Sequence, residues 1–326
     1  MSLLPSLAEI DAAAAVIDRV VPPTPHYSWP LLNARAGCEL WVKHDNHTAV
    51  GSFKIRGALA YLGRLVQREP DVRGVIAATR GNFGQAIAFA AGRHGLKATL
   101  VVPRRNSPEK NRAMRALGAE LIEHGDDFQA ALLRSAELAT DRGLHPVPSF
   151  HRDLVLGNAV SALSFLRGAP TLDLIYVPIG LGSGICAMMA ARDALGAPAK
   201  IIGVAADRAP GIALSFAARH VVSHPVSTRI ADGLACSTPN SDALEQILPG
   251  ADAVVRVTDE EVESAMRIYF SDTHNVAEGA AAAGLAAVLK DAARNAGRRV
   301  GLVCTGSNVD SAVFARVLGG AAAGLD

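Results

Sequence analysis

An alternation of apolar strands and amphipathic helices runs through most of this 326-residue chain and limits the folds that it can adopt. The first series predicts strands over 74–78, 98–102 and 121–122, with helices over 82–93, 108–117 and 126–142. The second predicts strands over 172–177, 200–205, 253–257 and 300–304, with helices over 158–167, 184–195, 278–290 and 309–317 and another opened by a capping box at 258–261. Parallel strands need a crossover between them, usually a helix, so this order predicts βαβ units.

We therefore expect an α/β protein of two domains, each a mostly parallel sheet flanked by helices, with one cleft between them. The length is about that of two domains. A helix over 7–20, a strand over 39–43 and a helix over 53–69 precede the first series, whereas residues 207–251 are predicted to be irregular. Ligands of open α/β sheets bind at the carboxyl ends of strands, so the loops there are the candidate sites.

The composition excludes several classes of function. A net charge of +1 with evenly mixed signs gives no basic surface for nucleic acid or an anionic membrane. The longest apolar run, 279–289, is too short to span a bilayer, and the first residues lack the basic stretch of a signal peptide. The four cysteines are far apart and form no CxxC pair, so we expect a soluble protein of a reducing cytoplasm.

One lysine stands at the start of an amphipathic helix. Ser52 is the expected N-cap of this helix, and its core-facing stripe consists of Ile55, Leu59, Leu62 and Val66. Lys54 lies at the edge of that stripe, near the helix end whose dipole disfavours cations. Both features lower the pKa of a lysine, as a free amine that attacks a carbonyl requires. The alternative is a solvated lysine whose stem covers apolar surface.

Two loops between a strand and a helix could bind anions. Residues 79–85 offer unpaired backbone N–H groups for a carboxylate, although an ordinary turn is an equal alternative. The glycine loop, residues 180–184, carries three glycines that let the backbone fold around a phosphate. Its rival interpretation is a dinucleotide loop with Asp207 at the ribose, but the third glycine comes one residue early for GxGxxG. We favour a single phosphate.

Three further features complete the set of candidates. Thr305 follows the last strand and offers a hydroxyl that can hydrogen-bond but holds no charge. Glu278 precedes a helix, where capping of its own helix is favoured over a reach into the cleft. His44 and His47 form an HxxH pair, which is no zinc site without further ligands. An amine, a phosphate loop and a hydroxyl together suit pyridoxal phosphate.

These motifs resemble those of the fold-type II pyridoxal-phosphate enzymes, specifically the threonine dehydratase and serine racemase family, over nearly the whole chain. The resemblance depends on five motifs in family order: Ser-Phe-Lys-Ile-Arg-Gly-Ala at 52–58, Gly-Asn-x-Gly-Gln at 81–85, the glycine loop, Ala-Asp-Gly at 231–233 and Thr-Gly-Ser-Asn at 305–308. The first motif is highly specific and the others are moderately so.

The resemblance implies a role for each motif. It makes Lys54 the catalytic residue that binds the cofactor covalently, and Thr79, Arg80, Gly81 and Asn82 the substrate-binding residues. The cofactor-binding residues that it implies are Phe53, Lys54, Asn82, Gly180, Leu181, Gly182, Ser183, Gly184, Gly233, Glu278 and Thr305. It further implies a small mobile domain over 54–146, a large cofactor-binding domain over 1–53 and 147–326, and a homodimer.

The implied activity is that of an ammonia-lyase, which removes water and then ammonia from a β-hydroxy amino acid to give a 2-oxo acid. L-Threonine and L-serine are the first candidate substrates. The same chemistry would serve threo-3-hydroxyaspartate or phenylserine, and a nicotinamide-dependent dehydrogenase built on the glycine loop is the rival of a different class.

Three positions depart from the family pattern. Arg80 stands where serine racemases have a serine acid–base, so racemisation is not expected, and we expect Arg80 to contact a polar or acidic substrate side chain or to face outward. Phe83 replaces the usual histidine. Ala205 and Ala206 replace the Glu-Pro of metal-activated relatives, so no divalent-metal site is expected there.

Overall fold

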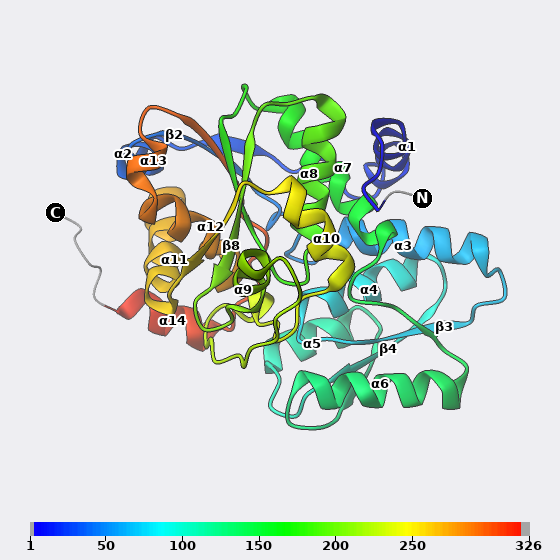
Figure 1. Ribbon diagram of the computed structural model, residues 1–326. Coiled ribbons are helices and arrows are strands. Elements are labelled where there is room, and N and C mark those ends of the chain that lie inside the picture. Colours follow the sequence, from blue (N-terminus) through cyan, green and yellow to red (C-terminus); the bar gives the residue numbers. More distant parts are fainter. Residues whose placement is uncertain (1–2, 321–326) are drawn as a thin grey trace.

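The computed structural model describes residues 3–320 and contains two sheets flanked by helices (Figure 1). The larger sheet has six strands in the order β1-β2-β10-β7-β8-β9; β1 is antiparallel to β2 and the other pairs are parallel. The smaller sheet has four parallel strands in the order β5-β4-β3-β6. The expected α/β class with two mostly parallel sheets is confirmed.

The strands of the larger sheet are β1 (His26–Ser28), β2 (Glu39–Lys43), β7 (Leu174–Pro178), β8 (Lys200–Ala206), β9 (Ala253–Val257) and β10 (Arg299–Val303). Those of the smaller sheet are β3 (Gly74–Ala78), β4 (Lys97–Val102), β5 (Glu120–Glu123) and β6 (His145–Pro146). The helices are α1 (Leu7–Ile17), α2 (Pro30–Ala36), α3 (Lys54–Arg68), α4 (Asn82–Arg93), α5 (Pro108–Ala116), α6 (Phe128–Arg142), α7 (Arg152–Gly168), α8 (Ser183–Leu195), α9 (Gly211–Ala218), α10 (Ser241–Gly250), α11 (Asp259–Thr273), α12 (Gly279–Lys290), α13 (Ala292–Asn295) and α14 (Ser311–Gly319), with a 3₁₀ turn, η1, at Asp232–Leu234.

The larger sheet is buried on both faces, as its apolar strands require. Along β7, Ile175 and Val177 point into the core that contains α7 and α8. The intervening residues Leu174 and Tyr176 point into the opposite core, which contains α11 and α12. This alternation follows from the two-residue period of a strand.

The smaller sheet is also covered on both faces. Val75 and Ala77 of β3 share the large core with α3, α4 and α7, so this core continues from one sheet to the other. Ile76 and Ala78 instead pack on Leu138 and its neighbours in α6. Figure 1 shows this sheet and helices α4, α5 and α6 grouped at the lower right of the larger sheet.

The strand order brings several loops together. Strands β2, β10 and β7 are consecutive neighbours in the larger sheet and run parallel, so the loops that leave them lie at one edge. These loops contain the approach to Lys54, residue Thr305 and the glycine loop. They form one wall of the candidate site.

The long periodic elements match the sequence predictions, but some of the other elements do not. α7 begins at Arg152 rather than 158, because the His151 side chain caps it and Gly157 lies inside the helix. The segment 207–251 was predicted to be irregular, and it contains α9, η1 and α10. Within residues 3–320, no helix combines the length and the apolar character needed to cross a bilayer.

Candidate active site

Lys54 is the first residue of α3, as the sequence indicates. The expected N-cap is wrong: Phe53 occupies the cap position, and the buried Ser52 hydroxyl has no hydrogen-bond partner within the described chain. The backbone N–H of Ser52 is instead bonded to Thr48 Oγ1 at 3.0 Å. α3 therefore starts without a side-chain cap of its own, and its first turn depends on tertiary contacts.

A close helix crossing supplies those contacts. Gly57 of α3 packs on Gly157 of α7, where an added Cβ would lie 2.1 Å from the Arg56 carbonyl oxygen. Asn158 Oδ1 accepts a hydrogen bond of 3.2 Å from the Gly57 N–H. The crossing therefore fixes the first turn of α3, and with it the position of Lys54, against α7.

A buried ion pair supports the same turn. The Arg56 side chain is fully buried, and its Nη1 lies 3.6 Å from Asp45 Oδ1. Asp45 also accepts hydrogen bonds from Thr24 Oγ1 and Ser161 Oγ, each of 2.7 Å. Sequence reasoning missed Asp45 and Ser161 as parts of the site, because only the tertiary fold brings the residues after β2 against α7.

Burial lowers the pKa of Lys54, while the nearby Cys236 thiol and the Glu278 carboxyl act in the opposite direction. The lysine Nζ lies 5.0 Å from the centroid of the Phe53 ring. Burial also raises the pKa of Cys236 to about 11, although the positive charges of Lys54 and Arg80 act to lower it. The expected direction of the Lys54 shift is present, with desolvation as its main cause.

The glycine loop has the conformation of an anion site. Gly182 has φ of +104°, a region that favours glycine, and a Cβ there would lie 2.6 Å from Ala243 Cβ. A Cβ at Gly180 would lie 2.4 Å from the Gly233 carbonyl oxygen. The N–H groups of Ser183 and Gly184, in the first turn of α8, have no acceptor within residues 3–320. They are free for a phosphate.

The loop between β3 and α4 is stabilised by hydrogen bonds among its own residues. Thr79 is buried, and its Oγ1 accepts hydrogen bonds from the N–H groups of Gly81 at 3.1 Å and Gly84 at 2.9 Å. The N–H groups of Arg80, Asn82 and Phe83 have no acceptor in the described chain. The free donors are therefore fewer than the sequence suggests, and the Thr79 hydroxyl shapes the loop.

Glu278 reaches into the cleft. It occupies the N-cap position of α12 but makes no side-chain cap, so the expectation of a helix cap is wrong. Its Oε1 accepts a hydrogen bond of 2.6 Å from Asn82 Nδ2, and Asn82 Oδ1 accepts one of 2.8 Å from Asn308 Nδ2. Burial raises the pKa of Glu278, while Lys110, Asn82 and Lys54 oppose the shift. These contacts join the smaller sheet's α4 to the larger sheet's loops.

Thr305 lies beside the start of α3. Its carbonyl oxygen accepts a hydrogen bond of 3.0 Å from the Phe53 N–H, and Ser52 pairs with Gly306 in an isolated β-bridge. The Gly306 carbonyl in turn accepts from the Glu278 N–H at 3.0 Å. Thr305, Glu278 and Lys54 are thus tied to one short segment of backbone.

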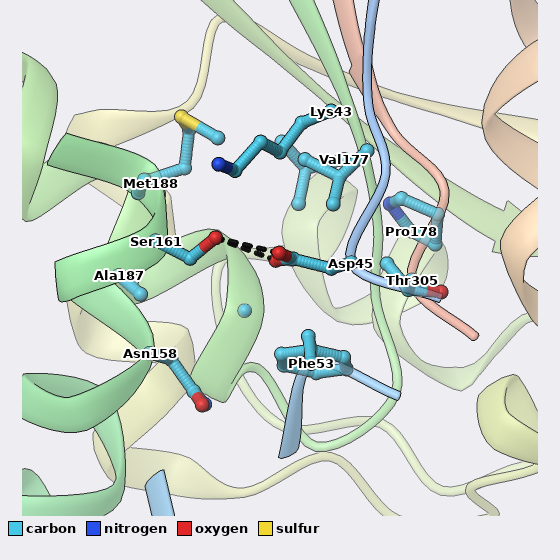
Figure 2. Close-up of a pocket in the computed structure, with 13 residues that line it drawn as sticks. Lys43, Asp45, Phe53, Asn158, Ser161, Val177, Pro178, Ala187, Met188 and Thr305 are labelled. Atoms are coloured by element: carbon cyan, nitrogen blue, oxygen red, sulfur yellow. Dashed lines mark hydrogen bonds between the residues drawn. The ribbon is translucent and has the colours of Figure 1, made fainter. Parts of the chain in front are cut away.

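A small cavity lies behind Phe53. Its volume is about 30 Å³, and Figure 2 shows Ser161 and Thr305 on opposite sides, with Asp45 between them and Phe53 below. Lys43 points toward the same space, where burial lowers its pKa and its Nζ donates to the Thr24 carbonyl at 2.6 Å. A space of this size has room for about two water molecules.

The HxxH pair has a different environment from a metal site. His44 Nε2 accepts a hydrogen bond of 3.0 Å from Trp29 Nε1, and burial lowers the pKa of His44 to about 4. Its ring stacks on that of His47 at 5.2 Å, and His47 Nε2 bonds to Asn275 Oδ1 at 2.7 Å. Each imidazole therefore has a hydrogen-bond partner and a stacking partner within the protein.

The residues around Lys54 fit a cofactor that carries an aldehyde and a phosphate. The amine is desolvated, and the free N–H groups of Ser183 and Gly184 lie at the neighbouring glycine loop. A Cβ at Gly184 would lie 3.5 Å from the Phe53 ring. Phe53, the residue before Lys54, therefore lies close against the glycine loop. Thr305, which carries a hydrogen-bonding hydroxyl, is joined through its carbonyl oxygen to the N–H of Phe53.

Comparisons with known proteins agree with this arrangement. The family model described as pyridoxal-phosphate dependent enzyme matches residues 17–306. An L-threonine ammonia-lyase of Thermotoga maritima is 30% identical over 316 residues, which are 96% of this chain and 78% of the relative. A catabolic L-threonine dehydratase of Staphylococcus aureus is 31% identical over 310 residues, 94% of this chain and 89% of the relative.

Among solved structures, maize serine racemase superposes with a TM-score of 0.90 at 26% identity and covers 96% of each chain. The matched residues include Lys54, the glycine loop and Thr305. The chain belongs to the family of pyridoxal-phosphate dependent enzymes, and its cofactor is pyridoxal 5'-phosphate.

Proposed function

We propose that this enzyme is an ammonia-lyase that removes water and then ammonia from a β-hydroxy amino acid and releases a 2-oxo acid. The observation that carries the proposal is the desolvated amine of Lys54, whose neighbour Phe53 is bonded to Thr305 and lies against the glycine loop. Relatives named threonine ammonia-lyase and threonine dehydratase, at about 30% identity over most of the chain, support it. Family membership removes the nicotinamide-dependent dehydrogenase from consideration.

The proposal assigns the cofactor's contacts residue by residue. Lys54 holds the aldehyde carbon, and Thr305 meets the ring nitrogen. The remaining cofactor contacts are Phe53, Asn82, Gly233 and Glu278 around the ring and Gly180, Leu181, Gly182, Ser183 and Gly184 at the phosphate. The unpaired N–H groups of the glycine loop support the phosphate assignment.

The substrate carboxylate is assigned to the loop between β3 and α4. The free N–H groups of Arg80, Asn82 and Phe83 point to an anion there, because the dipole of α4 adds attraction. Thr79 and Gly81 act through the shape of the loop. Thr79 Oγ1 fixes that shape by accepting two backbone hydrogen bonds.

The chemistry is divided between cofactor and protein. Bound pyridoxal phosphate supplies an electron sink for negative charge at the substrate's α-carbon. Lys54 is the group that would accept the α-proton at Nζ, and the desolvation that lowers its pKa favours the neutral amine this role requires. Thr305 offers a hydroxyl but no charge, which favours prompt loss of the β-hydroxyl over a long-lived carbanion.

A substrate panel tests the proposal. L-Threonine and L-serine are the first candidates, and threo-3-hydroxyaspartate and phenylserine are their rivals. The purified enzyme should release a 2-oxo acid and ammonia from at least one of them, and Lys54→Ala should release none. Turnover of none of the four by a cofactor-loaded enzyme would refute the assignment.

Three properties of the whole molecule belong to the same proposal. Residues 54–146 form a small domain that moves against residues 1–53 and 147–326. The enzyme is a homodimer, which light scattering coupled to size-exclusion chromatography can test. Its location is the cytoplasm, which suits four cysteines that are all free.

A further inference from the structure

Arg80 has no ion-pair partner among residues 3–320, and its side chain is exposed. It stands between the buried Thr79 and Gly81, at the carboxyl end of β3. The other charged residues of the neighbouring cleft are mostly matched. Lys110 Nζ lies 3.3 Å from Asp232 Oδ2, and the Ser107 hydroxyl donates to Asp310. The Arg80 guanidinium is therefore available to an anion from outside the chain.

The loop that carries Arg80 is fixed on both sides. Thr79 Oγ1 bonds the N–H groups of Gly81 and Gly84, and Asn82 is held by Glu278 and Asn308. Gly81 packs on the Lys110 stem, because an added Cβ would lie 2.6 Å from Lys110 Cδ. The backbone of Arg80 is thus set by its neighbours, which reduces the conformational cost of positioning its guanidinium.

Arg80 and Lys54 act on a common neighbour. The charge of Arg80 acts on the Cys236 thiol, and the same thiol lies within electrostatic range of Lys54. Cys236 is part of the segment that follows η1, whose Gly233 packs on the glycine loop. Asn82, two residues from Arg80, bonds to Glu278, whose carboxyl acts on Lys54, so Arg80 stands at the edge of the site that contains Lys54.

The donors at this loop divide into two sets. The free N–H groups of Arg80, Asn82 and Phe83 suit one carboxylate, the α-carboxylate that every amino acid has. The Arg80 guanidinium is a second, separate donor whose planar fork matches a further carboxylate. A substrate with an uncharged side chain would leave it without an anion.

We infer that Arg80 binds a second carboxylate on the substrate and makes β-hydroxy amino acids with an acidic side chain the preferred substrates. 3-Hydroxyaspartate is the smallest compound of this class. This inference rests on the proposed ammonia-lyase function and specifies its substrate. One charge-assisted contact of this kind changes kcat/KM by about 10- to 100-fold.

The test compares three substrates in four forms of the cofactor-loaded enzyme. The substrates are threo-3-hydroxyaspartate, L-threonine and L-serine; the forms are wild type, Arg80→Gln, Arg80→Lys and Arg229→Gln. Arg229 is the matched control, since it is another exposed arginine beside the cleft without an ion pair in the described chain. Binding of L-aspartate and L-alanine, followed by the change in visible absorption, gives a readout that needs no turnover.

We expect wild type to prefer 3-hydroxyaspartate and to bind aspartate more tightly than alanine. Arg80→Gln should lose about 10- to 100-fold on the acidic ligands and much less on the others, with Arg80→Lys between them. Equal losses on all ligands, or a selective loss in Arg229→Gln instead, would overturn the inference.

Turnover of threonine or serine without a preference for 3-hydroxyaspartate would overturn the inference and leave the ammonia-lyase function intact. If no β-hydroxy amino acid is turned over, the ammonia-lyase function fails, and the aspartate and alanine arm still decides the role of Arg80.

Discussion

Asn82 donates a hydrogen bond of 2.6 Å to Glu278, and this contact joins the helix after the smaller sheet's β3 to the helix that packs on the larger sheet. Asn82 accepts another from Asn308 at the same edge. Asn82 and Glu278 are 196 positions apart in sequence. A single polar contact between distant segments therefore lies where substrate and cofactor are expected to meet.

Glu278 should make stability depend on pH. Burial raises its pKa in the folded protein, whereas the unfolded chain has the ordinary value of about 4.3. The folded state then binds the proton of Glu278 more tightly than the unfolded chain does. The resulting contribution to the free energy of unfolding is fully present below a pH of about 4.3 and is lost as the pH rises through the raised pKa. Glu278→Gln should remove that loss and become more stable relative to wild type as the pH rises. Urea unfolding of both cofactor-free proteins measures their free energies of unfolding at several pH values. A difference between variant and wild type that stays constant with pH would contradict the prediction.

The contact of α3 with α7 predicts opposite effects for two glycines of one helix. An alanine side chain at Gly57 would lie 2.8 Å from Asn158 Oδ1 and 2.9 Å from the Leu154 carbonyl oxygen. Gly57→Ala should therefore cost about 1–3 kcal/mol of unfolding free energy and weaken cofactor binding at Lys54. Gly63→Ala is the control, since its nearest atom would be 3.7 Å away and alanine favours a helix by about 1 kcal/mol. Thermal melts in which both changes shift Tm in the same direction would argue against this packing.

The buried pair of Arg56 and Asp45 predicts a large loss when one partner is removed. Asp45→Ala would leave the fully buried Arg56 guanidinium without its carboxylate, which costs about 3–5 kcal/mol. Glu123→Ala removes the partner of an exposed arginine, Arg115, and should cost no more than about 1 kcal/mol. Chemical denaturation of both variants compares the two. Similar small losses would show that Asp45 does not stabilise the start of α3.

Thr305 predicts a change in reaction rather than in fold. A carboxylate introduced by Thr305→Asp would place a charge where wild type offers a neutral hydroxyl, and would favour a long-lived carbanion over elimination. We expect release of 2-oxo acid to fall by about tenfold or more, or ~1.4 kcal/mol in activation free energy. Thr305→Ser keeps the hydroxyl and should stay close to wild type. Full turnover by the aspartate variant would disprove the role given to this residue.

The sequence is sufficient to predict the parts of the fold that repeat. The strands and helices of both sheets have strong periodicity, and their order alone indicates parallel βαβ units. α9 and α10 were missed because α9 has no side-chain cap and Pro249 interrupts the pattern of α10. The start of α7 was missed because Gly157 weakens the helix signal, and this glycine is required by the close approach of α3.

The candidate site was predictable where its chemistry lies in local motifs. Lys54 and the glycine loop have recognisable neighbours in sequence, whereas Asp45 and Ser161 become relevant only through tertiary packing. Glu278 was expected to cap its helix, because the competing partner Asn82 lies in a distant segment. The sequence likewise could not show that Thr79 Oγ1 already accepts two amides of its own loop.

Covalent attachment of the cofactor to Lys54 is the central claim, and chemical reduction followed by peptide mapping tests it most directly. Borohydride treatment of the yellow, cofactor-loaded enzyme fixes the link between cofactor and lysine, and mass spectrometry of the digest locates it. We predict that the added mass lies on Lys54 and is absent from Lys54→Ala. An added mass on Lys43, a buried lysine beside this site, or on Lys110 would contradict the account.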